Sequence, residues 1–182
     1  MELILFPLLA SLIVWLIVIY NRLVRDKNRV LAAWSDIDVQ LKRRYELIPK
    51  LVEVVKGYSH YEQALFSDIT LLRNDCQQVS LPSEKGEIES QLGSKISGLF
   101  AVAEDYPVLK ASKQFLSLQQ NLSLLESDIQ LARRYYNGAV RNLNTRIDSF
   151  PDLLIARRVG FKPAELFELE SSLEKEPPKW SK

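Results

Sequence analysis

The chain has 182 residues, of which 47% are hydrophobic and 26% are charged, and its formal net charge is +1. This length fits one domain with or without an appendage, and the near-zero charge argues against nucleic acid as a partner. With one Cys and one His, an intrachain disulfide and the usual zinc sites are excluded. The sequence contains no glycine-rich phosphate loop, GxSxG or HExxH pattern, so most motif-bearing enzyme classes are unsupported.

The chain begins with an uncharged apolar stretch, LILFPLLASLIVWLIVIY, from Leu3 to Tyr20. At about 1.5 Å per helical residue the stretch reaches roughly 27 Å, close to the ~30 Å hydrocarbon core of a bilayer. A cleaved signal peptide is the alternative, but it requires a basic start and a small-x-small cleavage site, and neither flanks this stretch. We therefore predict a transmembrane helix. Its apolar residues include Leu3, Leu5, Leu9, Ile13, Trp15, Ile17 and Tyr20.

Four basic residues follow the apolar stretch directly: Arg22, Arg25, Lys27 and Arg29, with Asp26 the only acid among them. The positive-inside rule then predicts that the N-terminus lies outside and that the rest of the chain is cytoplasmic. A single unpaired Cys suits that reducing compartment. The same basic residues are candidates for contact with anionic lipid.

The hydrophobic pattern is helical from Val30 to about residue 72, with apolar residues at steps of three, four or seven. No helix breaker separates this segment from the apolar stretch, so one continuous helix is compatible with the sequence. Pro49 predicts a bend or a division of that helix near Leu47–Ile48. The Pro, Ser and Gly residues within residues 79–86 predict a linker.

Two more long helices follow the linker. One is expected from Glu87 to Asp105, where Tyr106-Pro107 ends it. The other runs from Phe115 to Ile147, with apolar residues alternating at steps of three and four, and ends at Ser149-Phe150-Pro151. A loop over residues 153–161 and a short helix around residues 164–169 complete the predicted elements.

Together these elements predict an all-α fold, an antiparallel up-and-down bundle of long helices preceded by one N-terminal transmembrane helix. The predicted parts are an anchor at residues 1–21, a cytoplasmic helical bundle at 22–170 and a flexible tail at 171–182. No metal ligand set or cofactor motif is recognised, so we predict no cofactor.

Two blocks of the sequence form a distinctive pattern, made up of Tyr20–Val24, Asn28–Val30, Ala33–Arg44, Leu47–Pro49 and Leu51–Val52, and of Ala132–Asn137, Ala139–Arg141, Asn144, Ser149–Pro151 and Gly160–Ala164. In order and spacing these residues resemble the LemA family of bacterial membrane proteins. Residues 61–95 and Tyr45 depart most from the family pattern. The resemblance implies a single-span protein of the bacterial inner membrane with a cytoplasmic helical bundle and no established enzymatic activity or cofactor. Some relatives look tied to the shaping of intracellular membranes, which makes scaffolding a reasonable class.

The charged segment WSDIDVQLKRR, from Trp34 to Arg44, is interpreted as a helix surface. Asp36 and Asp38 cannot act as an acid–base pair, because residues two apart point away from each other on a helix. Arg44, however, falls on the apolar face together with Trp34. Its guanidinium is expected to extend to the rim of the bundle. The alternative is a buried ion pair with an acid of the central region, which would fix helix register at a cost in stability.

The remaining candidates for interfaces lie in the C-terminal third of the chain. Tyr136 is expected in the core, which leaves Arg133, Arg134 and Tyr135 for outside contacts. Hydrogen bonds between helices are the favoured role for Asn137 and Asn144. Arg157 and Arg158 lie in the predicted loop, which is expected to pack on its own domain, with a membrane or protein contact as the alternative.

From the sequence we predict a non-enzymatic, membrane-anchored helical scaffold that binds the lipid bilayer and associates with itself or with other membrane proteins. No nucleic acid and no small-molecule substrate are expected. The alternative is an accessory subunit that recruits or regulates a membrane enzyme such as a protease. An enzyme in its own right would require acids distant in sequence to converge in a cleft.

Overall fold

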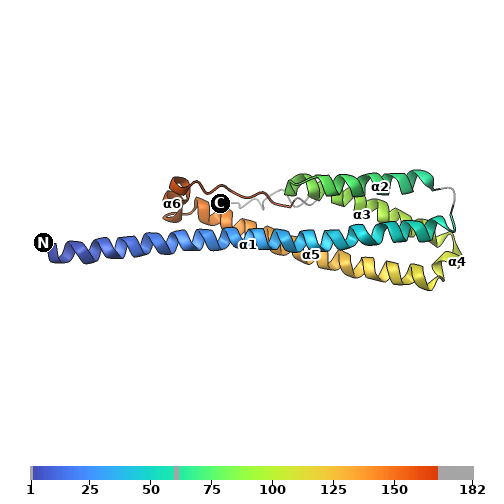
Figure 1. The fold of residues 1–182 in the computed structure, drawn as a ribbon, viewed down its shortest axis with the longest axis horizontal. Coiled ribbons are helices and arrows are strands. Elements are labelled where there is room, and N and C mark those ends of the chain that lie inside the picture. The colour runs from blue at the N-terminus through green and yellow to red at the C-terminus, as the bar shows by residue number, and fades with distance from the viewer. Residues whose placement is uncertain (1, 60–61, 168–182) are drawn as a thin grey trace, which may run out of the picture. The chain divides into compact units, whose positions relative to one another are not determined.

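The computed structural model describes residues 2–59 and 62–167, with side chains from Leu5 onward. Within these residues the chain forms α-helices and no strand, which confirms the predicted all-α fold (Figure 1). The helices are α1 (Glu2–Lys56), α2 (Gln63–Gln78), α3 (Pro82–Glu104), α4 (Pro107–Lys110), α5 (Lys113–Asp148) and α6 (Asp152–Val159). The predicted tail at residues 171–182 lies outside the described residues.

Helix α1 runs without interruption from the apolar stretch through Pro49 to Lys56 (Figure 1). The predicted division near Leu47–Ile48 is therefore wrong. Pro49 is exposed, whereas Ile48 and Leu51 beside it are buried. A proline inside a helix costs about 3 kcal/mol, and burial of two large aliphatic side chains offsets a cost of that size.

Three predicted boundaries in the rest of the chain also differ. Helix α3 begins at Pro82 rather than Glu87, because a proline in the first turn of a helix loses no hydrogen bond. The predicted loop at 153–161 is mostly helix α6, which ends at Gly160 with a φ of 82°. The helix predicted around residues 164–169 is absent from its described part, residues 164–167, which is extended or irregular.

The chain divides into two compact units, and both α1 and α5 contribute to each of them. Unit 1 comprises Met1–Leu41 and Ser127–Leu166, and unit 2 comprises Lys42–Glu126 and Phe167–Lys182. In unit 1, α1 and α5 run antiparallel, and α6 and residues 161–166, called the strap below, pack against them. The buried hydrophobic residues of this pair of helices include Leu23, Val30, Ala33, Ile37, Ile129, Tyr136, Val140, Leu143 and Ile147.

Unit 2 is a four-helix bundle formed by the end of α1, by α2 and α3, and by the beginning of α5. Side chains join neighbouring helices of this bundle: Lys95 on α3 pairs with Asp68 on α2, and the rings of Phe100 on α3 and Phe115 on α5 lie 6.0 Å apart. Its core residues are Ile48, Leu51, Val55, Phe66, Ile69, Cys76, Leu92, Ile96, Leu99, Phe115, Leu118, Leu122 and Leu125.

Candidate functional site

The apolar stretch of α1 is exposed at every described residue except Ile19, which is buried. Among the described residues, α1 is the one helix long and apolar enough to cross a membrane, and its apolar window is only 11% buried. A core helix of a soluble protein would be mostly buried. The predicted transmembrane residues Leu5, Leu9, Ile13, Trp15, Ile17 and Tyr20 are all exposed, and the side chain of Leu3 lies outside the described residues.

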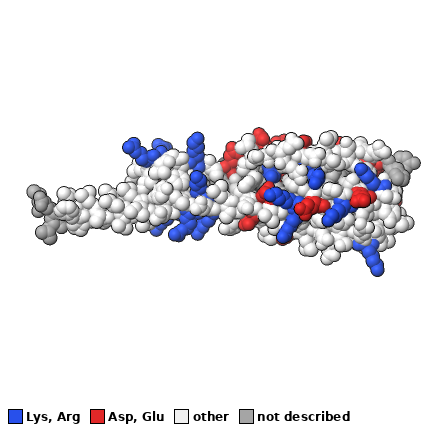
Figure 2. Space-filling view, in the orientation of Figure 1, with Lys and Arg blue, Asp and Glu red and all other residues white. Residues whose placement is uncertain are grey.

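Basic side chains surround the point at which this stretch ends. The predicted membrane-proximal residues Arg22, Arg25, Lys27 and Arg29 are all exposed on α1. Figure 2 shows Lys and Arg side chains gathered where the white apolar stretch ends. Asp26, which lies among them, is instead buried. Its carboxylate forms an ion pair with Arg146 on α5, with 2.6 Å between Asp26 Oδ2 and Arg146 Nε. The local surface therefore remains strongly cationic.

A groove of about 690 Å³ opens on unit 1 beside this basic segment, and we call it the membrane-proximal groove. Its walls come from α1, from Leu143 of α5 and from the turn and strap that follow α6. None of the residues that line it is acidic. They are Tyr20, Val24, Lys27, Asn28, Val30, Leu31, Leu143, Val159, Gly160, Phe161, Lys162, Pro163 and Ala164.

The strap that forms one wall of the groove is fixed by side chains of α1 and α5. Asn144 Nδ2 donates to the carbonyl of Ala164, and the backbone N–H of Ala164 donates to Asn144 Oδ1, both at 2.9 Å. The Tyr136 hydroxyl donates to the carbonyl of Glu165 at 2.8 Å. The ring of Phe161 meets the ring of Tyr20 edge to face at 6.3 Å between centroids. An extended segment is thereby held in place without a helix of its own.

Tyr136 joins the strap to the helix pair. Its ring is buried and lies 5.4 Å from the indole of Trp34 on α1. Burial, and to a smaller extent the Glu165 carboxylate, raises the pKa of Tyr136, so its hydroxyl remains a hydrogen-bond donor at neutral pH. The predicted core position of Tyr136 is confirmed. Asn144 was expected to form a hydrogen bond with another helix, but it bonds to the backbone of the strap.

A different polar arrangement lies in the core of unit 2. Arg44 is only 3% exposed, and its Nη1 atom lies 3.1 Å from Glu89 on α3 and 3.4 Å from Glu126 on α5. The Tyr45 hydroxyl donates to the other oxygen of Glu89, which is itself 1% exposed. The expectation that Arg44 extends to the rim is wrong. Its partners are acids of the central region, as the alternative proposed.

Burial of this network changes the proton affinity of its neutral members. Burial and the adjacent Glu89 carboxylate raise the pKa of Tyr45 far above its usual range, and they raise the pKa of Cys76 to about 12. Both groups are therefore protonated at neutral pH. Arg44, Tyr45 and Glu89 are almost fully buried, which suits a role in fixing helix register rather than chemistry on a substrate.

The other predicted interface residues are divided between core and surface. Arg133, expected outside, is only 8% exposed, and Asn137 is also buried. Arg134 and Tyr135 are exposed on α5, and Arg157 and Arg158 are exposed on α6. Because α6 buries only Ala156, its basic and apolar side chains, including Leu154 and Val159, are largely available at the surface.

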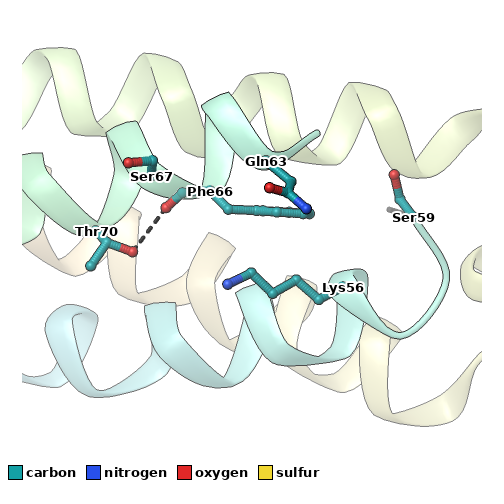
Figure 3. A pocket seen from close by; sticks show the side chains of 6 residues that line it. All are labelled: Lys56, Ser59, Gln63, Phe66, Ser67 and Thr70. Atoms are coloured by element: carbon teal, nitrogen blue, oxygen red, sulfur yellow. Dashed lines mark hydrogen bonds between the residues drawn. The ribbon is translucent and has the colours of Figure 1, made fainter. Parts of the chain in front are cut away.

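A second cavity, of about 510 Å³, lies in unit 2 between α1 and α2 (Figure 3). Lys56 extends toward the ring of Phe66, with its Nζ atom 5.3 Å from the ring centroid, a cation–π contact. The other lining residues are Ser59, Gln63, Ser67 and Thr70, none of which is an acid. Among the described residues, no group of three His, Cys, Asp or Glu side chains is placed to hold a metal ion.

Sequence reasoning did not identify Lys162, Phe161, Tyr45 or Glu89. Lys162 and Phe161 belong to a segment whose apolar residues have no helical or strand spacing. The two residues become part of a site only because the folded chain places them beside α1 in the membrane-proximal groove. Glu89 lies in the predicted second helix, but its partner on α1 is distant in sequence. The one feature of the sequence that could have identified Glu89 is its place on the apolar face of the helix. Leu92 and Ile96 follow it on that face at steps of three and four, and all three are buried.

The fold and the exposed apolar stretch define a class: all-α bundle proteins with one N-terminal helix suited to a membrane. Residues 33–181 match the model of the LemA family, and the chain belongs to that family. It is 30% identical over 149 residues to Protein LemA of Metamycoplasma hominis, an alignment that covers 81% of this chain and 68% of that protein.

Two further relatives carry the name of a magnetosome protein. The chain is 24% identical over 185 residues to Magnetosome protein MamQ 2 of Paramagnetospirillum magneticum, which covers 87% of this chain and 68% of that protein. It is 22% identical over 185 residues to Magnetosome protein MamQ of Magnetospirillum gryphiswaldense, with the same coverage. None of these names is the name of an enzyme.

Proposed function

We propose that this protein is a non-enzymatic scaffold, anchored in the bacterial inner membrane by the apolar stretch of α1, that associates with copies of itself or organises partner proteins there. The observation that carries the proposal is the continuity of α1: one helix supplies the apolar stretch and a packing surface in both units. A partner bound by either unit is thereby tethered to the membrane anchor through one helix.

The exposed surface of unit 1 supports the interaction role. Two long helices cannot enclose one another, and large apolar side chains remain outside. Leu131 and Tyr135, one helical turn apart on α5, are 57% and 59% exposed, and Leu31 and Val39 are exposed on α1. An exposed aromatic and aliphatic surface beside charged residues is typical of protein interfaces.

The basic residues after the apolar stretch support an orientation with the N-terminus outside and the chain from residue 22 onward in the cytoplasm. A Cys introduced at exposed Lys50 in unit 2 tests this orientation, because a membrane-impermeant maleimide would label it only after the membrane is opened. Labelling in intact cells would overturn the proposed topology.

Self-association is tested by the mass of the full chain after gentle extraction from cross-linked native membranes. We expect a multiple of the 21.0 kDa chain, and we expect the double substitution Leu131→Glu/Tyr135→Glu to reduce it to the monomer. Leu71→Glu on α2 is the matched control, since Leu71 is 59% exposed and lies in unit 2. Recovery of monomer alone from wild-type membranes would overturn self-association.

A further inference from the structure

We propose that the membrane-proximal groove binds one anionic phospholipid of the surrounding bilayer, with its phosphate between Lys27 and Lys162 and the upper part of an acyl chain against Tyr20, Val24 and Val159. The inference rests on the proposed membrane anchor. It assigns to unit 1 a specific lipid site in addition to general attraction of anionic lipid by basic residues.

The chemistry of the lining matches the two parts of a phospholipid. Both lysines line the groove and are exposed, and neither forms an ion pair within the described part of the chain. The lining contains no carboxylate, and the nearby Asp26 carboxylate is engaged by Arg146. Most of the remaining lining is aliphatic or aromatic. A cationic and apolar lining favours an anionic headgroup with a hydrocarbon chain over a free anion.

The position of the groove brings it to the bilayer surface. Tyr20 is the last residue of the apolar stretch and also the first lining residue of the groove. An aromatic side chain at this point is typical of the boundary between hydrocarbon and headgroups. The Cα–Cβ bonds of a helix tilt toward its N-terminus, so the side chain of Lys27 is directed back toward the bilayer. The groove is therefore open at the height where lipid phosphates lie.

The far wall of the groove is fixed independently of lipid. Asn144 holds the backbone of Ala164, and Tyr20 contacts the ring of Phe161, so Lys162 stands on a segment tied at both sides. A preformed site loses less conformational freedom on binding than a flexible one. Helix α6 adds exposed Leu154 beside exposed Arg158, a pairing suited to a headgroup region.

The test uses the full chain in vesicles made of equal parts phosphatidylglycerol and phosphatidylcholine. After gentle detergent extraction, native mass spectrometry reads the lipids that remain bound. We expect one retained phosphatidylglycerol in preference to phosphatidylcholine. Lys27→Gln/Lys162→Gln should reduce the preference about twenty-fivefold, because each lysine near a membrane surface contributes about fivefold to attraction of an anionic lipid.

Two further variants distinguish lipid binding in the groove from general attraction of the lipid by positive charge. Arg22→Gln/Arg25→Gln removes the same charge from exposed residues of the same segment that do not line the groove, and it should keep the retained lipid. Val159→Trp leaves all charges in place and fills the groove, and it should lose the lipid. Equal losses in the lysine and arginine variants, retention in Val159→Trp, or equal binding of both lipids would overturn the proposal.

Failure of the anchor itself would look different. A chain that does not float with the mixed vesicles contradicts the proposed membrane function. A chain that floats with these vesicles but retains both lipids equally contradicts the groove alone.

Discussion

Units 1 and 2 share the helices α1 and α5, but the Arg44 network of unit 2 and the membrane-proximal groove of unit 1 accommodate charged groups in opposite ways. Unit 2 encloses Arg44, Tyr45 and Glu89 within its four-helix bundle, and all three side chains are almost fully buried. Unit 1 has two long helices, and it leaves Lys27 and Lys162 exposed in a groove. Charges that are sealed among helices fix how the helices pack, whereas charges that remain accessible can bind ligands. We therefore expect the buried charges of unit 2 to contribute to stability and the exposed lysines of unit 1 to contribute to binding.

The largest expected effect is the loss of Glu89. Glu89→Leu leaves the buried Arg44 guanidinium without its nearest carboxylate, which typically costs about 3–5 kcal/mol in the free energy of unfolding. Glu126→Leu is the control, because the Glu126 side chain is 40% exposed and its pair with Arg44 should contribute only about 0–1 kcal/mol. Urea unfolding of the full chain in mild detergent, followed by helical circular dichroism, measures both values.

The double variant Arg44→Met/Glu89→Leu sharpens this test. It removes both charges, so it should be markedly more stable than Glu89→Leu alone if the cost arises from an unpaired buried charge. If the double variant is as unstable as the single one, loss of packing rather than charge explains the effect.

The second prediction concerns alkaline pH. The pKa of Cys76 is about 12 in the folded protein, whereas its ordinary value is 9.0. Between these values the folded protein keeps a proton that the unfolded chain releases, so the free energy of unfolding falls as pH rises through this window. Unfolding experiments at successive pH values should show a shallower decline in Cys76→Ala. An unchanged slope in that variant would contradict a role for the thiol proton.

The sequence predicted the long helices because their apolar residues recur at helical spacing over many turns. It misjudged proline, which is tolerated inside α1 at Pro49 and begins α3 at Pro82, because packing and position in the helix decide its effect. Helix α6, at eight residues, is too short for periodicity to distinguish it from a loop.

The two polar sites were predicted unevenly. Arg44 was identified as a candidate because it falls on the apolar face, but its pairing with Glu89 depends on how α1 and α3 pack. The basic residues next to the apolar stretch were equally visible in the sequence. The groove was not, because Lys162 and Phe161 reach it through contacts of a strap that has no regular spacing.

The smallest expected effect is in unit 1 and concerns the strap. Asn144→Ala removes both hydrogen bonds to the backbone of Ala164, which should cost about 1–2 kcal/mol. Hydrogen exchange of residues 161–166 should become faster, and retention of phosphatidylglycerol should fall because one wall of the groove is released. Asn142→Ala, at an exposed position of the same helix, should leave both properties unchanged.

Asn144→Asp separates the two bonds at Ala164. Its carboxylate can still accept from the Ala164 N–H but cannot donate to the Ala164 carbonyl, so exchange of the strap should lie between those of wild type and Asn144→Ala. If the strap exchanges alike in wild type, Asn144→Ala and Asn144→Asp, it is held by Phe161 and Tyr136 rather than by Asn144. Because unit 2 contains none of these contacts, its exchange rates should be the same in every variant, which would show that the groove and the buried Arg44 network can be altered separately.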